Sequence, residues 1–105
     1  MKPSRYAAHE VEEHLRTRLP GWSLEDGQIV RTYETGEWTR TMLLANAIGF
    51  LAEAAGHHPD LLLSYPRVRV MLSTHDAGGI TESDFALAEQ IEELARRQPE
   101  PPASA

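Results

Sequence analysis

Apolar side chains recur at helical spacing in three stretches of the chain, and pairs of short extended runs separate these stretches. Residues 4–18 form the first helical pattern, in which apolar residues return every fourth position and Ser4 is a candidate N-cap. Pro20-Gly21 ends this pattern. The apolar runs on either side of Asp26-Gly27 are typical of two strands joined as a β-hairpin.

The strongest helical pattern covers residues 37–55. Its apolar residues repeat at spacings of three and four, and no charged residue stands between Arg40 and Glu53, so we expect this helix to be covered on more than one side. Gly56 suits the left-handed position that follows a helix, and Pro59 disfavours helical geometry at the residue before it. Glu53 is therefore predicted to lie in the last turn of this helix, with His57 and His58 just beyond it.

Two further strands and a last helix complete the order. Residues 61–64 are predicted to form a short strand, and residues 67–74 form the clearest strand because apolar and polar side chains alternate there. Thr81 and Asp84 have the spacing of a capping box, and a helical pattern follows to about Arg97. The order helix, two strands, helix, two strands, helix predicts an α+β fold, with an antiparallel sheet and helices gathered on one face.

Composition sets limits on the class of protein. The chain has 105 residues, enough for one domain, which we place at residues 1–97; residues 98–105 form a Pro-rich tail that we expect to be flexible. No apolar run is long enough for a membrane span, and the N-terminus lacks the apolar core of a secretory signal. The absence of Cys excludes disulfide scaffolds, cysteine catalysis and thiolate metal sites, and fits a cytoplasmic protein. The net charge of −6 argues against direct binding to nucleic acid.

Three histidines and one glutamate are the candidate catalytic residues. Glu53 and His57 are four positions apart at a helix end, so their side chains can meet and the carboxylate can orient the imidazole. His58 lies at a corner that Pro59 stiffens, and His75 ends the last strand, from where it could approach this corner. Imidazoles beside a carboxylate suit proton transfer near neutral pH.

Other interpretations of the same residues stay open. The three histidines can be ordinary helix-end and loop residues, or ligands of a zinc ion. Asp84 can serve only as a helix cap, and Trp22 only as a core residue. The segment His9–His14 departs from the zinc motif H-E-x-x-H, because Glu13 stands where the second histidine belongs, so we expect a solvated helix surface there.

The run of residues from Glu53 to Asp84 matches one family pattern as a whole. The pattern is an acidic residue, three others, His-His-Pro, an aromatic residue six positions after the proline, a Ser-Thr-His strand end and a later Asp. In this chain these are Glu53, His57-His58-Pro59, Tyr65, Ser73-Thr74-His75 and Asp84. The sequence thus resembles the pterin-4a-carbinolamine dehydratase family, and a weaker likeness extends over residues 5–96.

The resemblance implies a four-stranded antiparallel sheet with three helices packed on one face, and a homodimer or homotetramer. It implies the elimination of water from 4a-hydroxytetrahydropterin to quinonoid dihydropterin, a step of tetrahydrobiopterin recycling that needs no metal or organic cofactor. The residues implied as catalytic are His57, His58 and His75, with Glu53 orienting His57. The residues implied as binding the pterin are Gly56, Pro59, Ser73, Thr74, Asp76, Trp22 and Asp84.

Two alternatives to the enzyme remain at this point. The first is a non-catalytic, dehydratase-like binding protein, because the family includes a Rubisco assembly factor and a dimerisation partner of a transcription factor. Retention of the histidines together with Glu53 and Pro59 favours the enzyme over this alternative. The second is a metal-dependent hydrolase, which would require bound zinc.

Overall fold

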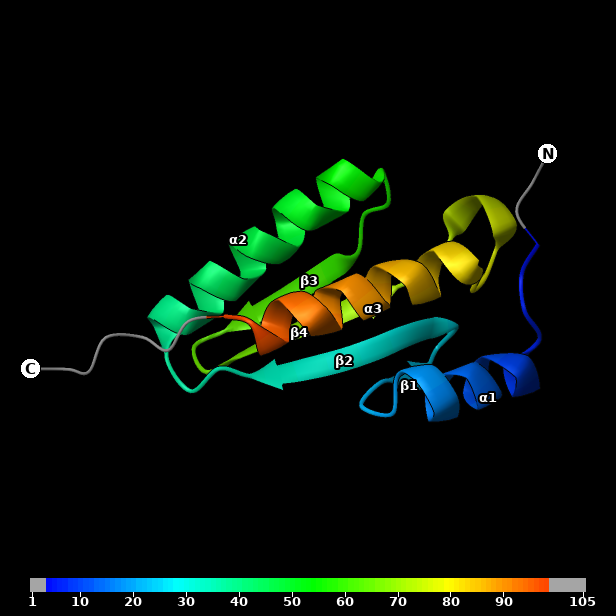
Figure 1. Ribbon diagram of the computed structural model, residues 1–105, viewed down its shortest axis with the longest axis horizontal. Coiled ribbons are helices and arrows are strands. Elements are labelled where there is room, and N and C mark those ends of the chain that lie inside the picture. Colours follow the sequence, from blue (N-terminus) through cyan, green and yellow to red (C-terminus); the bar gives the residue numbers. More distant parts are fainter. Residues whose placement is uncertain (1–3, 99–105) are drawn as a thin grey trace, which may run out of the picture.

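The computed structural model describes residues 4–98 and shows three α-helices beside one four-stranded sheet (Figure 1). The helices are α1 (Ala8–Arg18), α2 (Trp38–Ala55) and α3 (Glu82–Arg96). The strands are β1 (Ser23–Glu25), β2 (Gln28–Glu34), β3 (Asp60–Ser64) and β4 (Arg67–Leu72), and a short 3₁₀ turn, η1, covers His75–Ala77. The predicted order of elements and the α+β class are confirmed.

All neighbouring strands of the sheet are antiparallel, in the spatial order β1-β2-β4-β3. The two hairpins therefore meet through their second strands, with Ile29 opposite Leu72 and Tyr33 opposite Val68. The face of the sheet away from the helices carries polar side chains, as the alternation in β4 predicts, together with the apolar Val30, Leu62 and Met71. The ion pair of Arg69 with Glu25 crosses this face at 3.0 Å.

The core lies between the sheet and the helices. Alternate residues of β4 point into it, so that Val68, Val70 and Leu72 are fully buried, while α2 and α3 contribute Ile48 and Phe85 from above. Burial of each side chain of this size stabilises the fold by about 1.5–3 kcal/mol relative to exposure. Residues at every second position of the strand and residues about 3.6 positions apart in the helices together form this one core.

The first helix begins later than the sequence predicts. Residues 4–7 are not helical, because the backbone N–H of Tyr6 donates a hydrogen bond of 2.8 Å to the carbonyl of Ile80. The N-cap is Ala7 rather than Ser4, and Glu10 closes the first turn by accepting from the N–H of Ala7 at 2.8 Å. A contact across the fold thus overrides the local preference of Ser4 for a cap.

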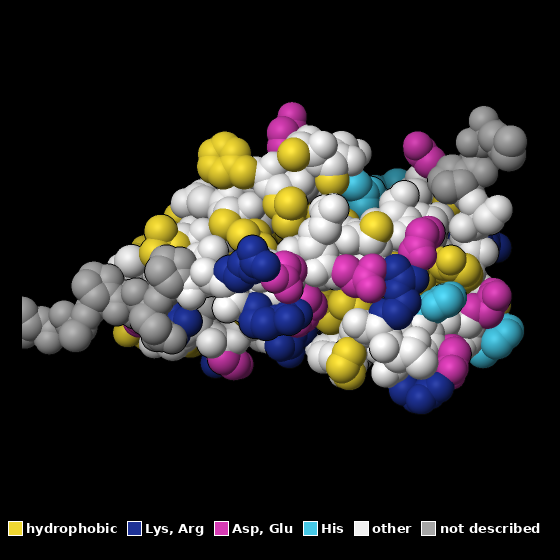
Figure 2. Space-filling view, viewed as in Figure 1, with side chains coloured by type: hydrophobic (Ala, Val, Ile, Leu, Met, Phe, Trp, Pro, Cys, Tyr) yellow, Lys and Arg dark blue, Asp and Glu magenta, His cyan; other side chains and the backbone are white. Residues whose placement is uncertain are grey.

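Helix α2 keeps one apolar face outside the core. The exposed fraction is 50% for Trp38, 45% for Leu43 and 78% for Phe50. Figure 2 shows hydrophobic side chains along the outside of this helix. The expectation that α2 is covered on more than one side is not met within the single chain. No helix of the described part of the chain has the length and apolar character needed to cross a membrane. Most of the predicted tail, from residue 99 onward, lies outside the described residues.

Candidate active site

The C-terminal end of α2 brings two histidines out of the helix in different directions. Gly56 adopts the left-handed conformation, with φ of 67°, and its N–H bonds back to the last turn of the helix. This turn ends the helix as predicted, and the N–H of His57 donates to the carbonyl of Ala52 at 3.2 Å. His57 consequently heads toward α3, while His58 folds back over the outside of α2.

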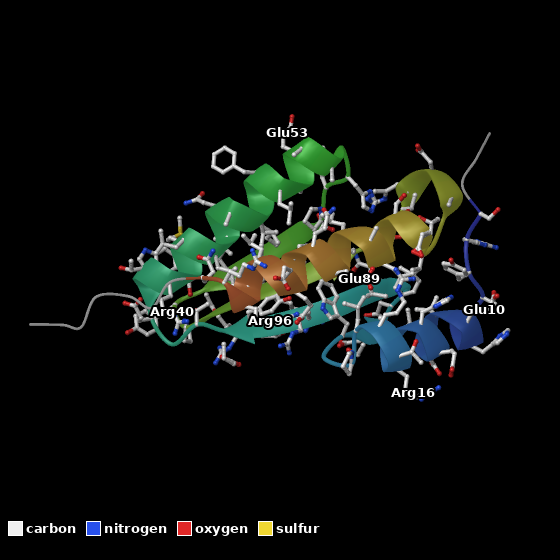
Figure 3. The ribbon with its side chains drawn as sticks, in the orientation of Figure 1. Glu10, Arg16, Arg40, Glu53, Glu89 and Arg96 are labelled. Atoms are coloured by element: carbon white, nitrogen blue, oxygen red, sulfur yellow. The ribbon has the colours of Figure 1, made fainter. Side chains whose placement is uncertain are left out.

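The predicted pairing of Glu53 with His57 is wrong. Oε1 of Glu53 instead lies 2.7 Å from Nε2 of His58, within hydrogen-bond distance, and both side chains are well exposed. Figure 3 shows Glu53 on the outer side of α2, directed away from α3. The four-residue spacing requires a helix that continues through His57, and the left-handed turn at Gly56 shifts the contact by one residue.

Asp84 is the actual partner of His57. Its Oδ1 lies 2.6 Å from Nε2 of the imidazole, although the carboxyl group is fully buried in the first turn of α3. Its Oδ2 accepts from the backbone N–H of Thr81 at 2.8 Å and from the hydroxyl of Thr74 at 2.7 Å. A buried carboxylate requires such donors, and here they come from α3, from the end of β4 and from the end of α2.

The hydrogen-bond network around Asp84 limits where the proton on His57 can lie. A backbone N–H can only donate, so Oδ2 of Asp84 is an acceptor, and the hydroxyl of Thr81 donates to Thr74, 2.8 Å away, while Thr74 donates to Asp84. An ionised Asp84 also accepts on Oδ1, and in that state Nε2 of His57 carries the hydrogen. In neutral His57 the lone pair is then on Nδ1, which has no hydrogen-bond partner within residues 4–98.

A small pocket opens beside His57. It has a volume of about 250 Å³ and is lined by the end of α2, by Thr74 and by the side of α3 that carries Ser83, Leu87 and Gln90. The imidazole of His57 is about one fifth exposed toward this side, so it can reach a bound molecule while Asp84 holds it from behind. Figure 2 shows histidine side chains beside the C-terminal end of α2.

The remaining predicted residues lie at the same end of the fold with one exception. His75 and Asp76 start the exposed η1 turn directly after Thr74, and Gly56 and Pro59 flank the two histidines. Trp22 does not line the pocket at His57: it is buried, and its indole N–H donates to Glu92 at 2.8 Å. Asp84 cannot contact a substrate directly, because it is fully buried, so its position gives it an orienting role instead.

Thr81 is a functional candidate that the sequence reasoning missed. It was recognised only as part of the capping box, which the structure contains. Both its N–H and its hydroxyl serve the Asp84 network, the second through Thr74. The Thr-x-x-Asp spacing was the available signal, but nothing local indicates that the carboxylate of this box also binds a histidine.

The described residues contain no group of three His, Asp or Glu side chains arranged to hold a metal ion. The arrangement can instead move protons: the imidazole of His57, held by Asp84, lies at a pocket, and a second imidazole, paired with Glu53, is next to it in the chain. Such a set can accept a proton at one atom and donate one at another.

Comparison with known proteins gives one consistent family. The family model described as Pterin 4 alpha carbinolamine dehydratase matches residues 4–94. A protein of Chloroflexus aurantiacus, provisionally named pterin-4-alpha-carbinolamine dehydratase, is 50% identical over 90 residues, which are 86% of this chain and 96% of that protein. A protein of Aquifex aeolicus with the same provisional name is 44% identical over 92 residues, covering 88% and 92% of the two chains.

Two solved structures share the fold. One, described as a transcriptional coactivator/pterin dehydratase from Brucella melitensis, has a TM-score of 0.79 and 31% identity, and the match covers 88% of this chain and 99% of that one. The other is a pterin dehydratase-like protein described as a RuBisCO assembly factor in the alpha-carboxysome, with a TM-score of 0.59, 20% identity, and coverage of 70% and 86%. The second likeness concerns the fold alone.

Proposed function

This chain belongs to the pterin 4 alpha carbinolamine dehydratase family, and we propose that it is an active 4a-hydroxytetrahydropterin dehydratase. The observation that carries the proposal is the contact of His57 with the buried Asp84, which leaves Nδ1 of the imidazole free to accept a proton beside a pocket. The buried carboxylate of Asp84 is held by two donors, the hydroxyl of Thr74 and the N–H of Thr81, and its other oxygen meets the histidine, an arrangement that suits catalysis.

The reaction removes water from the substrate and needs one proton acceptor and one proton donor. In our proposal Nδ1 of His57 takes the proton from N5 of the pterin, and the N5 electron pair forms the C4a=N5 bond as the C4a–O bond breaks. A second imidazole, that of His58 or His75, protonates the departing hydroxyl, which leaves as water. Asp84 stabilises the imidazolium that forms on His57, and general acid–base help of this kind contributes about 10²–10⁴-fold to a rate.

The pterin itself is proposed to bind across the end of α2 and the segment after β4. Main-chain groups near Gly56 and between Ser73 and Asp76 border the histidines, and flat heterocycles with alternating donors and acceptors are recognised by such groups. The substrate class and a role in tetrahydropterin recycling in the cytoplasm are part of this proposal. The family name supports the first.

We further propose that the protein acts as a homodimer or homotetramer. Exposed apolar side chains on α2, above all Phe50 and Trp38, continue onto the edge strand β3, where Leu63 is 37% exposed, and onto Tyr65. Clusters of large apolar side chains at the surface of a monomer mark interaction sites. The same surface is what a binding role without catalysis would use, and the coactivator and assembly-factor relatives make that role the second candidate.

Stopped-flow measurement of the dehydration of 4a-hydroxytetrahydropterin tests the proposal. Wild-type protein is expected to accelerate the reaction well above its spontaneous rate, and His57→Ala is expected to lose at least about 10²-fold of this acceleration while remaining folded. A wild-type rate equal to the blank, with a folded protein, would reject the enzyme. Recovery of a stoichiometric foreign partner from source lysate together with that result would establish the binding role.

A further inference from the structure

The loop between β4 and α3 carries His75, whose side chain has no support of its own. The imidazole is exposed, and within residues 4–98 no side-chain hydrogen bond, ion pair or ring contact holds it. The loop closes at its base, where the N–H of Thr74 donates to the carbonyl of Gly79 at 2.8 Å and the N–H of Gly79 donates back at 3.3 Å. The orientation of the imidazole therefore depends on the backbone between these two residues.

The far end of this loop contains two consecutive glycines, Gly78 and Gly79. Glycine loses more conformational freedom on ordering than any other residue, so this end of the loop costs the most entropy to hold in one conformation. Gly78 adopts the left-handed conformation, with φ of 69°, and its N–H donates to the carbonyl of His75 at 3.1 Å. A contact made to Gly78 from outside the loop therefore acts on the backbone that orients His75.

Arg5 makes such a contact from the N-terminal segment. Its Nη1 donates to the carbonyl of Gly78 at 3.3 Å, although the two residues are 73 positions apart. Its aliphatic stem lies along the same turn, because a Cβ placed on Gly79 would be 3.3 Å from Cδ of Arg5 and 3.7 Å from its Cβ. Gly78 is thus bonded through its N–H to His75 and through its carbonyl to Arg5.

The segment that carries Arg5 is itself fixed to the fold. The N–H of Tyr6 donates to the carbonyl of the buried Ile80 at 2.8 Å. The centroid of the Tyr6 ring lies 4.8 Å from that of His14 on α1 and 5.5 Å from that of Phe85 on α3. Figure 1 shows this N-terminal segment running past the loop between β4 and α3 at one end of the molecule. Arg5 therefore reaches the loop from a support that two helices hold in place.

We propose that Arg5 is a positioning residue for His75 in the dehydration reaction, an inference that rests on the proposed function. By holding the carbonyl of Gly78, Arg5 keeps the imidazole of His75 within reach of the departing hydroxyl. Thr74 is fixed independently of Arg5, since its hydroxyl donates to Asp84 at 2.7 Å, so the main-chain groups at the end of β4 that border the pterin stay in place without Arg5. The effect of Arg5 should consequently fall on kcat and leave KM almost unchanged.

Amide hydrogen exchange in the full chain tests the contact without an assay of activity. Arg5 is exposed, so Arg5→Met leaves the core intact, keeps the aliphatic stem and removes the donor to Gly78. Exchange at the amides of Ala77 and Gly78 should become about fivefold faster, the equivalent of one hydrogen bond. Arg16→Met is the matched control, because Arg16 is an exposed arginine whose ion pair lies within α1. Unchanged exchange in Arg5→Met, or equal acceleration in Arg16→Met, would overturn the contact.

Dehydration kinetics test whether the contact acts through His75. Arg5→Met is expected to lower kcat about fivefold and to change KM by less than about twofold, while Arg16→Met keeps the wild-type values. In a His75→Ala background, Arg5→Met should lower kcat no further. A wild-type kcat in Arg5→Met, a loss confined to KM, or an equal loss of kcat in the His75→Ala background would reject the positioning role. A folded wild-type protein without activity would reject the proposed function, and with it this role of Arg5, while the exchange rates would still establish or refute the contact.

Discussion

Nε2 of His57 lies 2.6 Å from Oδ1 of Asp84, so two residues 27 positions apart are joined at the point where α2 ends and α3 begins. The contact turns a helix-capping residue into the support of an imidazole. Whether His57 can accept a proton depends on which of its ring nitrogens carries the hydrogen. Single substitutions at Asp84 can change that position.

Asp84→Asn is expected to reverse the tautomer of His57. The N–H of Thr81 can only donate, so the amide oxygen must take the place of Oδ2, and the amide NH₂ then faces Nε2 of the imidazole. Nδ1 gains the hydrogen and loses its function as proton acceptor. We expect kcat to fall about 10²-fold with little change in KM, and the ¹⁵N spectrum of His57 to show protonation at Nδ1. A lost rate with Nε2 still protonated would contradict the assignment.

Thr74→Val is expected to lower the free energy of unfolding by about 1–3 kcal/mol, because a buried carboxylate oxygen loses one of its donors. Thr74→Ser restores the hydroxyl and should recover most of this loss. Urea denaturation of both variants gives the comparison. An unchanged stability of Thr74→Val, with Thr74→Ser destabilised, would show that the methyl group, rather than the hydroxyl, matters at this position.

His58→Ala tests the second imidazole. The side chain is exposed, so its removal should change the free energy of unfolding by less than about 0.5 kcal/mol. We expect the dehydration rate to fall about 10²-fold if His58 is the proton donor. His9→Ala, at an exposed position of α1, is the control and should keep the wild-type rate. Retention of the rate in His58→Ala assigns proton donation to His75, which His75→Ala then checks.

Phe50→Glu is expected to dissociate the oligomer without unfolding the chain. Phe50 is 78% exposed in the single chain, so a charge there meets water in the monomer but would be buried between subunits. Light scattering coupled to size-exclusion chromatography should give the monomer mass. Thr17→Glu places the same charge on an exposed part of α1 and should leave the assembly intact. A wild-type mass equal to that of the monomer would reject the proposed oligomer.

Tyr33→Phe is expected to make the free energy of unfolding fall less steeply as the pH rises through the alkaline range. The folded protein holds the pKa of Tyr33 above that of the unfolded chain, first through burial and then through the bond to Glu92. Its contribution is therefore present below about pH 10 and is lost as the pH rises toward the folded pKa, with a slope of up to about 1.4 kcal/mol per pH unit. Denaturation between pH 9 and 11 measures this slope. Tyr65→Phe makes the same change at an exposed tyrosine, and an identical flattening there would contradict the origin in Tyr33.

The sequence predicted those features that depend on neighbouring residues. Gly56 and Pro59 placed the end of α2 correctly, because a left-handed glycine and a residue before proline act within one turn. The same turn defeated the predicted contact of Glu53 with His57, since a shift of one residue changes which imidazole lies over the carboxylate. Helical spacing describes contacts within a helix and says nothing about the residues just beyond it.

Contacts between distant segments were beyond such reasoning. Asp84 was recognised by its spacing from Thr81, but its bonds to Thr74 and His57 depend on how β4, α2 and α3 meet in space. Trp22 was assigned to the pterin through the family resemblance, whereas its indole is turned to Glu92 on α3. His57 is 27 positions from Asp84 and Glu92 is 70 positions from Trp22, separations that no local sequence pattern indicates.

The strand order β1-β2-β4-β3 has a consequence for how the chain folds. The two hairpins close over short turns, but the central pairing of β2 with β4 joins residues 33 to 43 positions apart, from Glu34 with Arg67 to Ile29 with Leu72. Closing this long loop costs chain entropy before any contact across it offsets the loss, and topologies rich in such contacts fold slowly. The pairing of β2 with β4 should therefore lie near the rate-limiting step, and substitutions at Ile29 or Leu72 should slow folding more than those in α1.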